Sequence, residues 1–433
     1  MKRSIYNNVI SLSTGYFLLY NSYANMYILM KKNVCDAFFM LSVEEIKIKF
    51  SSFYEKLIES GCLVEDYIDE VGLLKERIHQ VENEDSDYYL TINPTLNCNF
   101  KCWYCYENHL YRSKMEVDIL ERVKKHLENV IKKLNHTQRF HLGFFGGEPL
   151  LYYTDVVQPI LKHLKLLCME YGVDSSIGIT SNGYLIKEQM VNELKELNVS
   201  SFQITLDGGR EFHNKVRYPY NGGDSYNQIL SSIKKLIHVG IYVVLRINYT
   251  QANLLSVRSI IEDLKDIPES DKLFLAVDFQ RVWQDGDSND LVLQDCLEEC
   301  IDGFENLGLR VSSRILNQVW RPCYADRKNQ ALINFNGDVY KCTARDFTHE
   351  NRLGVLNASG DIEWDAHKMG RRMNQRLSKE MCCDCRIAPL CGGTCTQRIL
   401  DSGDRIDCIR GLDETGKDRV VLDRFYYNMV KQV

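Results

Sequence analysis

The sequence predicts an α/β fold: a partial (β/α)6 TIM-like barrel between a small N-terminal module and a cysteine-rich C-terminal segment. Between residues 89 and 310, short apolar stretches alternate with helical ones, which is typical of parallel βαβ units. Residues 1–88 instead combine a hairpin pattern with short helices. Residues 311–433 show little helical periodicity and contain eight of the 16 cysteines, so we expect a loop-rich domain held by metal.

The N-terminal module is predicted from turn and capping signals. Strand-like stretches at 15–20 and 25–30 are separated by polar residues, as in a hairpin. A helix is expected from Ser42, because Glu45 completes a capping box, and another runs through 53–60 to Gly61. This pattern predicts a small winged-helix-like module, and the charged run 82–87 predicts a connector after it.

The central region contains six predicted strands, at 89–94, 140–145, 176–180, 201–206, 242–249 and 273–279. Helical patterns such as 115–134 and 186–197 lie between them. Six such units fit a partly closed barrel better than an eightfold one, although spacing cannot prove closure. In such barrels the chemistry lies at the carboxyl ends of the strands. Polar loops follow the first four strands there, so we expect one site at this rim.

Composition excludes several classes of function. The chain has 433 residues and a net charge of −6, so it has no basic patch predicting nucleic-acid or anionic-membrane partners. Its first residues lack the apolar region and cleavage site of a signal peptide, and no apolar run is long enough to cross a bilayer. We therefore expect a cytoplasmic protein, in which clustered cysteines more often bind metal or act in redox chemistry than form disulfides.

Three cysteines, Cys98, Cys102 and Cys105, follow the first central strand with the spacing C-x3-C-x2-C. A [4Fe–4S] cluster ordinarily takes four thiolates, so three from one loop leave one iron able to bind a small-molecule cofactor. The alternative is zinc. Structural zinc usually takes four ligands in pairs such as C-x2-C, and no fourth ligand is close in sequence. The triplet therefore favours redox chemistry.

The motif Gly146-Gly-Glu-Pro149 follows the second central strand. By itself it could be a simple turn, but glycines let a ligand approach the backbone and Glu148 could accept hydrogen bonds from an ammonium group. Together with the cysteine triplet, the motif resembles the radical S-adenosylmethionine (SAM) superfamily over roughly residues 88–310. That resemblance implies a partial (β/α)6 barrel and reductive cleavage of SAM to a 5′-deoxyadenosyl radical.

The resemblance also implies roles for individual residues. Cys98, Cys102 and Cys105 are implied to hold the cluster, whose fourth iron chelates SAM. The implied SAM contacts are Tyr104 at the adenine, Gly146, Gly147 and Glu148 at the amino group, Asn182 at the ribose or carboxylate, and Arg217 at the carboxylate. For Arg217 an ordinary surface arginine is the alternative.

A second cysteine set lies near the C-terminus: Cys323-x13-Gly337-x4-Cys342, then Cys382-x2-Cys385-x5-Cys391-x3-Cys395, then Cys408. It exceeds what one zinc needs, and a two-zinc ribbon is the alternative. The array resembles the SPASM domain of radical SAM enzymes that modify peptides and proteins. The resemblance implies two auxiliary iron–sulfur clusters, the outer held by Cys382, Cys385, Cys391 and Cys408 and the inner by Cys323, Cys342 and Cys395. Asn329 stands where sulfatase-maturing members have a further cysteine, which implies an open iron or a non-cysteine ligand in the inner cluster.

The N-terminal module resembles the leader-recognition domains of peptide maturases, although a structural cap on the barrel is the alternative. The resemblance implies a maturase that installs thioether or carbon–carbon crosslinks in a ribosomally made precursor peptide with a leader. It also implies a low-potential electron donor of the flavodoxin or ferredoxin type. Alternatives are a sulfatase-maturase-like enzyme, which Thr343 disfavours because those members have aspartate there, and a zinc-binding interaction protein. Asp278 and Asp346 are candidate catalytic acids or bases.

Overall fold

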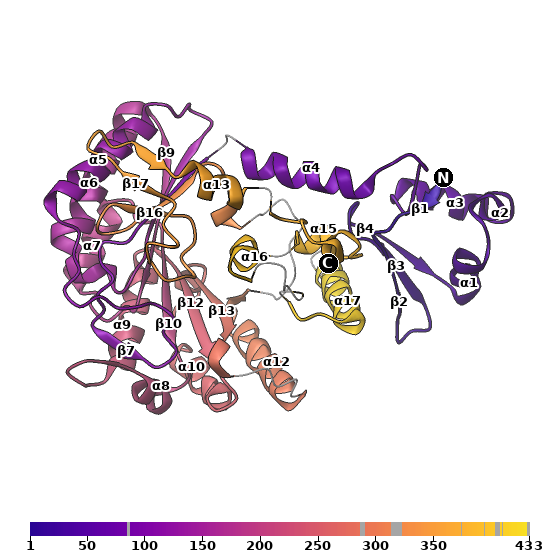
Figure 1. Ribbon diagram of the computed structural model, residues 1–433. Coiled ribbons are helices and arrows are strands. Elements are labelled where there is room, and N and C mark those ends of the chain that lie inside the picture. Colours follow the sequence, from indigo (N-terminus) through magenta and orange to yellow (C-terminus); the bar gives the residue numbers. More distant parts are fainter. Residues whose placement is uncertain are drawn as a thin grey trace. The chain divides into compact units, whose positions relative to one another are not determined.

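The computed structural model describes residues 1–84, 87–285, 291–312, 323–373, 375–393, 395–402, 408 and 410–430 (Figure 1). The chain forms two compact units. One comprises residues 1–84, 314–328 and 366–433, and the other comprises residues 85–313 and 329–365. Both units are discontinuous in sequence, and the contiguous division into 1–88, 89–310 and 311–433 stays a prediction.

The second unit is built on a largely parallel sheet. Its six central strands are those predicted from the sequence: β6 (Tyr88–Ile92), β8 (Arg139–Phe144), β9 (Asp174–Ser181), β10 (Ser201–Leu206), β12 (Tyr242–Tyr249) and β13 (Leu275–Arg281). They pair in parallel in the order β13-β12-β10-β9-β8-β6. The predicted class, α/β with parallel βαβ units, is confirmed.

Both ends of this sheet carry further strands. Beyond β13 lies the short parallel strand β14 (Arg310–Val311). Beyond β6 the sheet continues through β15 (Gln330–Ile333), which is parallel to β6, and then through antiparallel strands. These are β16 (Asp338–Tyr340), β17 (Gly354–Leu356) and β18 (Ile362–Trp364). The sequence pattern does not predict β14–β18, because strands of two to four residues carry almost no periodicity.

Side-chain alternation along the strands separates the core from the site. On β12, residues Val243, Leu245 and Ile247 are fully buried in the apolar core, whereas Arg246 and Asn248 point to the opposite face. Figure 1 shows helices on the outer side of the sheet. They include α5 (Val117–Ile131), α6 (Gln158–Tyr171), α7 (Glu188–Glu196) and α9 (Ser225–His238). The further helices of this unit are α8 (Arg210–Val216), α10 (Arg258–Asp263), α11 (Glu269–Lys272) and α12 (Leu291–Asn306).

The first unit begins with an antiparallel sheet of β2 (Asn7–Ser11), β3 (Phe17–Asn21) and β4 (Met26–Met30), which confirms the predicted hairpin. Helices α1 (Lys32–Met40), α2 (Val43–Lys49) and α3 (Ser51–Glu59) follow, and the Ser42–Glu45 capping box is present. Strand β1 (Lys2–Arg3) pairs with β5 (Leu63–Val64), after which comes α4 (Glu70–Asn83).

The C-terminal part of this unit is more helical than expected. It contains α13 (Ala366–Arg372), α14 (Glu380–Cys383), α15 (Ala388–Cys391), α16 (Thr396–Ser402) and the 17-residue α17 (Glu414–Val430). Apolar residues of α15 and α17 pack against β2 and β3, with Leu390, Val421 and Phe425 contacting the cluster around Leu18 and Tyr20. The N-terminal sheet and the C-terminal helices therefore share a core.

The predicted charged connector needs a correction at its first residue. Glu82 belongs to α4, is 3% exposed and lies 3.5 Å from Arg376. Burial raises the pKa of its carboxyl to about 7, although Arg376 opposes that shift. The acidic run in the sequence gives no sign of this pairing, because the arginine is almost 300 positions away in the chain. Among the described residues, no helix is long and apolar enough to span a membrane.

A buried ion pair in the first unit gives a test of its packing. Arg372, 4% exposed, contacts Asp326 at 3.3 Å and donates to the Ala325 carbonyl and to Gln397. Arg372→Ala leaves the Asp326 carboxylate buried without its partner, so we expect a loss of about 3–5 kcal/mol in the free energy of unfolding. Arg371→Ala, on the exposed neighbour, is the control and should stay within about 0.5 kcal/mol of wild type. Urea unfolding followed by far-UV circular dichroism, at equal iron content, measures both.

Candidate active site

A pocket lies where the parallel strands of the second unit end. Side chains from β9, β10, β12 and β13 line it together with the cysteine loop and the loop after β8. The predicted residues that reach it are Cys98, Cys102, Cys105, Tyr104, Gly146, Gly147, Asn182 and Arg217. The structure thus brings to one rim side chains spread over 120 positions of the sequence.

The cysteine loop is held by a short antiparallel pair of strands, β7 (Phe100–Cys102) and β11 (Arg217–Pro219). In this register Cys102 lies opposite Arg217, whose Nη1 is 3.6 Å from the Cys102 Sγ. The Phe100 N–H donates to the Cys98 Sγ at 3.4 Å, and the Cys105 N–H donates to the Cys102 carbonyl at 3.1 Å. The loop is therefore ordered by hydrogen bonds within it and by its pairing with β11.

All three thiols are disfavoured as thiolates by burial. Desolvation raises the pKa of Cys98 to about 12 and that of Cys102 to about 11, and it also raises that of Cys105. Iron binding must therefore displace protons from these groups. Within the described residues, no three His, Cys, Asp or Glu side chains form a group suited to a single metal ion. A cubane cluster has several irons and can take each thiolate at a separate one.

The two glycines after β8 pack against the backbone of the cysteine loop. A Cβ at Gly146, where φ is +105°, would lie 2.3 Å from the Thr95 carbonyl oxygen, and one at Gly147 would lie 2.2 Å from that of Asn97. The Gly147 and Glu148 N–H groups donate to these same two carbonyls, at 3.2 and 2.9 Å. Glycine is needed here because another chain segment, not only a ligand, occupies the space of a side chain.

Glu148 joins the glycine loop to the loop after β9. Its fully buried carboxylate accepts hydrogen bonds from the Leu150 N–H at 3.0 Å, the Ser181 hydroxyl at 2.9 Å and the Asn182 N–H at 2.8 Å. Burial raises its pKa, and these donors oppose the shift. Its oxygens thus bind the protein, and the contact with the SAM amino group that the resemblance implies stays a prediction. Asn182 itself reaches the cysteine loop by donating to Asn99 at 2.8 Å.

A buried polar network surrounds Tyr104. Its hydroxyl donates to Asp207 and accepts from Arg217 at 3.0 Å and from Asn248 at 3.2 Å. Burial raises the pKa of Tyr104 well above its ordinary value, so the hydroxyl keeps its proton. Burial also raises the pKa of Asp207, while Arg217 opposes that shift. His213 accepts from the Asp207 N–H, and burial lowers its pKa to about 3, so it is neutral.

Several buried polar atoms at this pocket have no hydrogen-bond partner among the described residues. Two lining residues carry such atoms, the Arg217 Nε and both carboxylate oxygens of Glu107, and the Asp207 Oδ1 is a further one in the network around Tyr104. Burial, with a contribution from Asp346, raises the pKa of Glu107 to about 8. Leaving such atoms unpaired costs free energy unless a ligand binds them. The pocket thus fits a ligand that carries both donors and acceptors.

The structure places the two candidate acid–base residues outside this lining. Asp278 accepts from the Gln280 side chain and from the Ser312 hydroxyl. Asp346 is half-buried, and its carboxylate acts on Glu107 through charge. Other lining residues are not predicted from the motifs, among them Gln203, Thr205, Arg246, Asn248, Arg281 and Gln284. Strand alternation could have found the first four, because they occupy the non-core positions of β10 and β12.

Comparison with known protein families identifies the domain that carries this pocket. Residues 92–257 match the model of the radical SAM superfamily. The chain contains a radical SAM domain. It is an enzyme of that superfamily, whose members use a [4Fe–4S] cluster and SAM, and the three thiols and the polar pocket fit these two groups.

Known proteins resemble this radical SAM enzyme over most of its length. The cyclopropyl synthase TigE of Paramaledivibacter caminithermalis is 22% identical over 402 residues, covering 85% of this chain and 80% of TigE. The fold resembles the sulfatase maturase anSMEcpe with bound AdoMet, with a TM-score of 0.58 and 20% identity over 79% of this chain and 97% of that one. It also resembles Streptococcus suis SuiB bound to the precursor peptide SuiA, with a TM-score of 0.54 and 16% identity over 93% of this chain and 97% of SuiB.

The second cysteine set of this radical SAM enzyme is divided between the two units. Cys342 belongs to the radical SAM unit, and the other six belong to the first unit. Cys382, Cys385 and Cys391 lie in the short segment containing α14 and α15, where Cys385 accepts the N–H of Ala388 through its carbonyl. Burial raises the pKa of Cys385. Cys408 is half-buried, between residues outside the described part of the chain.

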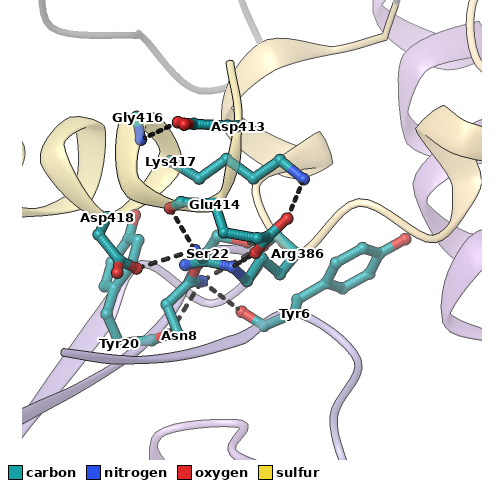
Figure 2. A network of polar contacts seen from close by, with 10 residues as sticks. All are labelled: Tyr6, Asn8, Tyr20, Ser22, Arg386, Asp413, Glu414, Gly416, Lys417 and Asp418. Carbon is teal, nitrogen blue, oxygen red and sulfur yellow. Dashed lines mark hydrogen bonds and ion pairs between the residues drawn. The ribbon is translucent and has the colours of Figure 1, made fainter. Parts of the chain in front are cut away.

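Arg386, next to Cys385, ties this segment to the N-terminal sheet (Figure 2). Its guanidinium donates to Asn8 at 2.6 Å and to Glu414, and it lies 2.8 Å from Asp418. Its carbonyl accepts from Asn8 at 3.3 Å and from Ser22 at 2.6 Å. Asn8 and Ser22 are at most 1% exposed. The N-terminal strands therefore fix the backbone beside this cysteine.

The contact between the glycine loop and the cysteine loop can be tested with two matched variants. Gly146→Ala places a Cβ 2.3 Å from the Thr95 oxygen, so we expect displacement of the cysteine loop and loss of most iron from the radical SAM site. Gly222→Ala also occurs at positive φ, +73°, but has nothing within 4 Å of the new Cβ, so it should keep its iron. Iron and sulfide per chain, with 5′-deoxyadenosine formation, measure the effect. Equal losses in both variants would show that backbone strain alone is responsible.

Proposed function

We propose that this radical SAM enzyme is a peptide maturase that crosslinks a ribosomally made precursor peptide, through a thioether or a carbon–carbon bond. The observation that supports this most is the extent of the structural likeness. The match to SuiB covers 93% of this chain, whereas that to anSMEcpe covers 79%. SuiB has been solved bound to its precursor peptide SuiA, so a peptide substrate fits a fold shared over nearly the whole chain.

In this proposal, the chain's own residues prepare the site for SAM. Cys98, Cys102 and Cys105 hold the cluster, and the glycine loop fixes their backbone. When bound, the cluster and SAM together supply a 5′-deoxyadenosyl radical that abstracts hydrogen from an unactivated carbon. Tyr104, Arg217 and Asn182 orient SAM around the pocket, and the Gly146 and Gly147 backbone lies at its amino group. Low dielectric at this buried rim strengthens each of these contacts.

We further propose two auxiliary iron–sulfur clusters, which would accept the electron that hydrogen abstraction leaves on the substrate. Cys382, Cys385, Cys391 and Cys408 form the ligand set of the outer cluster, and Cys323, Cys342 and Cys395 that of the inner one. Thiolates are the usual ligands of such clusters, and seven spaced cysteines supply one full set and one open set. An open iron in the inner cluster could take a substrate thiolate.

The second candidate is a protein-modifying enzyme of the anaerobic sulfatase-maturase type, which the likeness to anSMEcpe favours. Thr343 counts against it, since aspartate follows the corresponding cysteine in that type.

A single experiment separates the peptide maturase from the sulfatase-maturase type. The reduced holoenzyme, SAM and a cysteine-containing short peptide encoded beside its gene are incubated without oxygen. A peptide that loses two hydrogen atoms per event and resists fragmentation between two residues supports the crosslink. An aldehyde that reacts with hydroxylamine supports the alternative, and an unmodified set of neighbouring peptides contradicts the maturase proposal.

Replacing the first cysteine triplet separates the proposed clusters. Cys98→Ala/Cys102→Ala/Cys105→Ala should abolish 5′-deoxyadenosine formation, because no other described cysteine lines the pocket. The variant should keep part of its brown colour and iron, since the auxiliary ligand sets are intact. Iron analysis and electron paramagnetic resonance of the reduced variant measure the remainder. A colourless variant would contradict the auxiliary clusters, while leaving the radical SAM domain untouched.

The Tyr104 hydroxyl offers a finer test of SAM orientation. Tyr104→Phe leaves Arg217 and Asp207 without the group that bridges them, while the ring remains. Hydrogen bonds to charged groups contribute about 1.5–3 kcal/mol, so we expect SAM affinity to fall by roughly ten- to a hundredfold. Equilibrium dialysis with the oxidised holoenzyme measures this, and Tyr111→Phe, on a 78% exposed ring, is the control. Unchanged affinity in Tyr104→Phe would show that the hydroxyl network around Tyr104 does not contribute to SAM binding.

A further inference from the structure

The sulfur of Cys105 lies beside an imidazole. His109 follows Cys105 by four residues in the same loop, and its Nε2 is 3.5 Å from the Cys105 Sγ. His109 is half-buried and belongs to the lining of the SAM pocket. The other two sulfurs of the triplet have different N–H neighbours, the backbone of Phe100 and the guanidinium of Arg217. Among the described residues, Cys105 is thus the member of the triplet with an imidazole at its sulfur.

The backbone on both sides of His109 is fixed to the rest of the site. The Cys105 N–H donates to the Cys102 carbonyl at 3.1 Å, and the Leu110 N–H donates to the Leu96 carbonyl at 3.2 Å. Because both ends of this short segment are held by main-chain hydrogen bonds, the loop itself places the imidazole beside the sulfur.

We propose that the His109 Nε2–H donates a hydrogen bond to the Cys105 thiolate when this thiolate holds iron, and that the bond raises the reduction potential of the cluster. An iron-bound thiolate has no proton and can only accept, so the imidazole has to be the donor. Reduction adds one electron to the cluster, and part of the added negative charge reaches its sulfur ligands. A donor at the sulfur therefore stabilises the reduced form more than the oxidised form.

The hydrogen bond affects how the cluster handles its electron. With it, the cluster is easier to reduce, and its driving force for reducing SAM is smaller. The cluster gains one electron, no bond is formed or broken, and no proton moves. In this role His109 is a positioning residue that acts through Cys105. The inference rests on the radical SAM domain and its cluster, and it is independent of the peptide proposed as substrate.

The test compares His109→Leu with His109→Gln in the holoenzyme. Leucine fills the place of the ring without a donor and keeps water from the sulfur, whereas glutamine carries an N–H group at a similar reach. Without oxygen and SAM, each protein is titrated with a europium(II) chelate, and electron paramagnetic resonance gives the midpoint potential. The signal followed is the one that the Cys98→Ala/Cys102→Ala/Cys105→Ala variant lacks.

We expect the two variants to differ. In His109→Leu the equilibrium constant for reduction should fall about tenfold, a shift of about 59 mV for one electron. His109→Gln should recover most of this change. Asn108→Leu is the matched control, because Asn108 is exposed in the same loop and lies outside the lining of the SAM pocket. It should keep the constant within about twofold of wild type.

The measurement remains valid when some iron is lost, because a midpoint potential does not depend on the fraction of chains that carry a cluster. If His109→Leu binds no cluster at all, His109→Phe takes its place. An unchanged midpoint in the variant without a donor overturns the proposal. So does an equal fall in His109→Gln and Asn108→Leu, which indicates a disturbed loop. Strong nitrogen hyperfine coupling in the wild-type spectrum also overturns it, because the imidazole then binds iron directly.

Discussion

The contact on which the radical SAM site depends is a backbone contact between two loops. Gly147 and Glu148 donate to the carbonyls of Thr95 and Asn97, and no side chain fits between the two segments. Because these loops follow the neighbouring strands β6 and β8, the parallel sheet brings them to the same rim. The position of three thiols is thereby set by main-chain geometry, which is stiffer than any arrangement of long side chains. The Glu148 carboxylate adds a third segment to this contact, because it accepts hydrogen bonds from Ser181 and Asn182 at the end of β9 and in the loop after it.

Next to these two loops lie buried charged side chains whose hydrogen-bonding atoms are not all paired within the described part of the protein. Arg217, Asp207 and Tyr104 form a connected network, yet each charged member keeps an atom without a partner among the described residues. Buried atoms without a hydrogen-bond partner raise the free energy of the empty pocket, and a ligand that pairs with them removes this cost. Desolvation raises the pKa of all three thiols, so binding of iron as thiolate ligands is linked to release of their protons.

The sequence predicts those features that depend on residues close together in the chain, and it misses those that depend on distant residues. The six central strands, the Ser42 capping box and the cysteine triplet depend on local patterns, and the structure bears out the strands and the cap. Glu82 is different, since its buried partner Arg376 is almost 300 positions away. The role of Glu148 is also hidden in sequence, because a carboxylate after two glycines suggests ligand binding until its three protein donors are seen. Strands as short as β14 and β16 offer no period to detect.

The network around Arg386 joins the N-terminal sheet to the segment that carries Cys382, Cys385 and Cys391. Asn8 and Ser22 bind the Arg386 backbone carbonyl, and the Arg386 side chain returns to Asn8 and to α17. A shift of β2 therefore strains the peptide group next to Cys385, because the hydrogen bonds from Asn8 and Ser22 to the Arg386 carbonyl are partly buried and cost free energy to break. Conversely, a ligand that fixes Cys385 also restricts β2. If a peptide leader adds to this sheet, its binding is coupled to the Cys385 segment through these hydrogen bonds and through the apolar core that the sheet shares with α15 and α17.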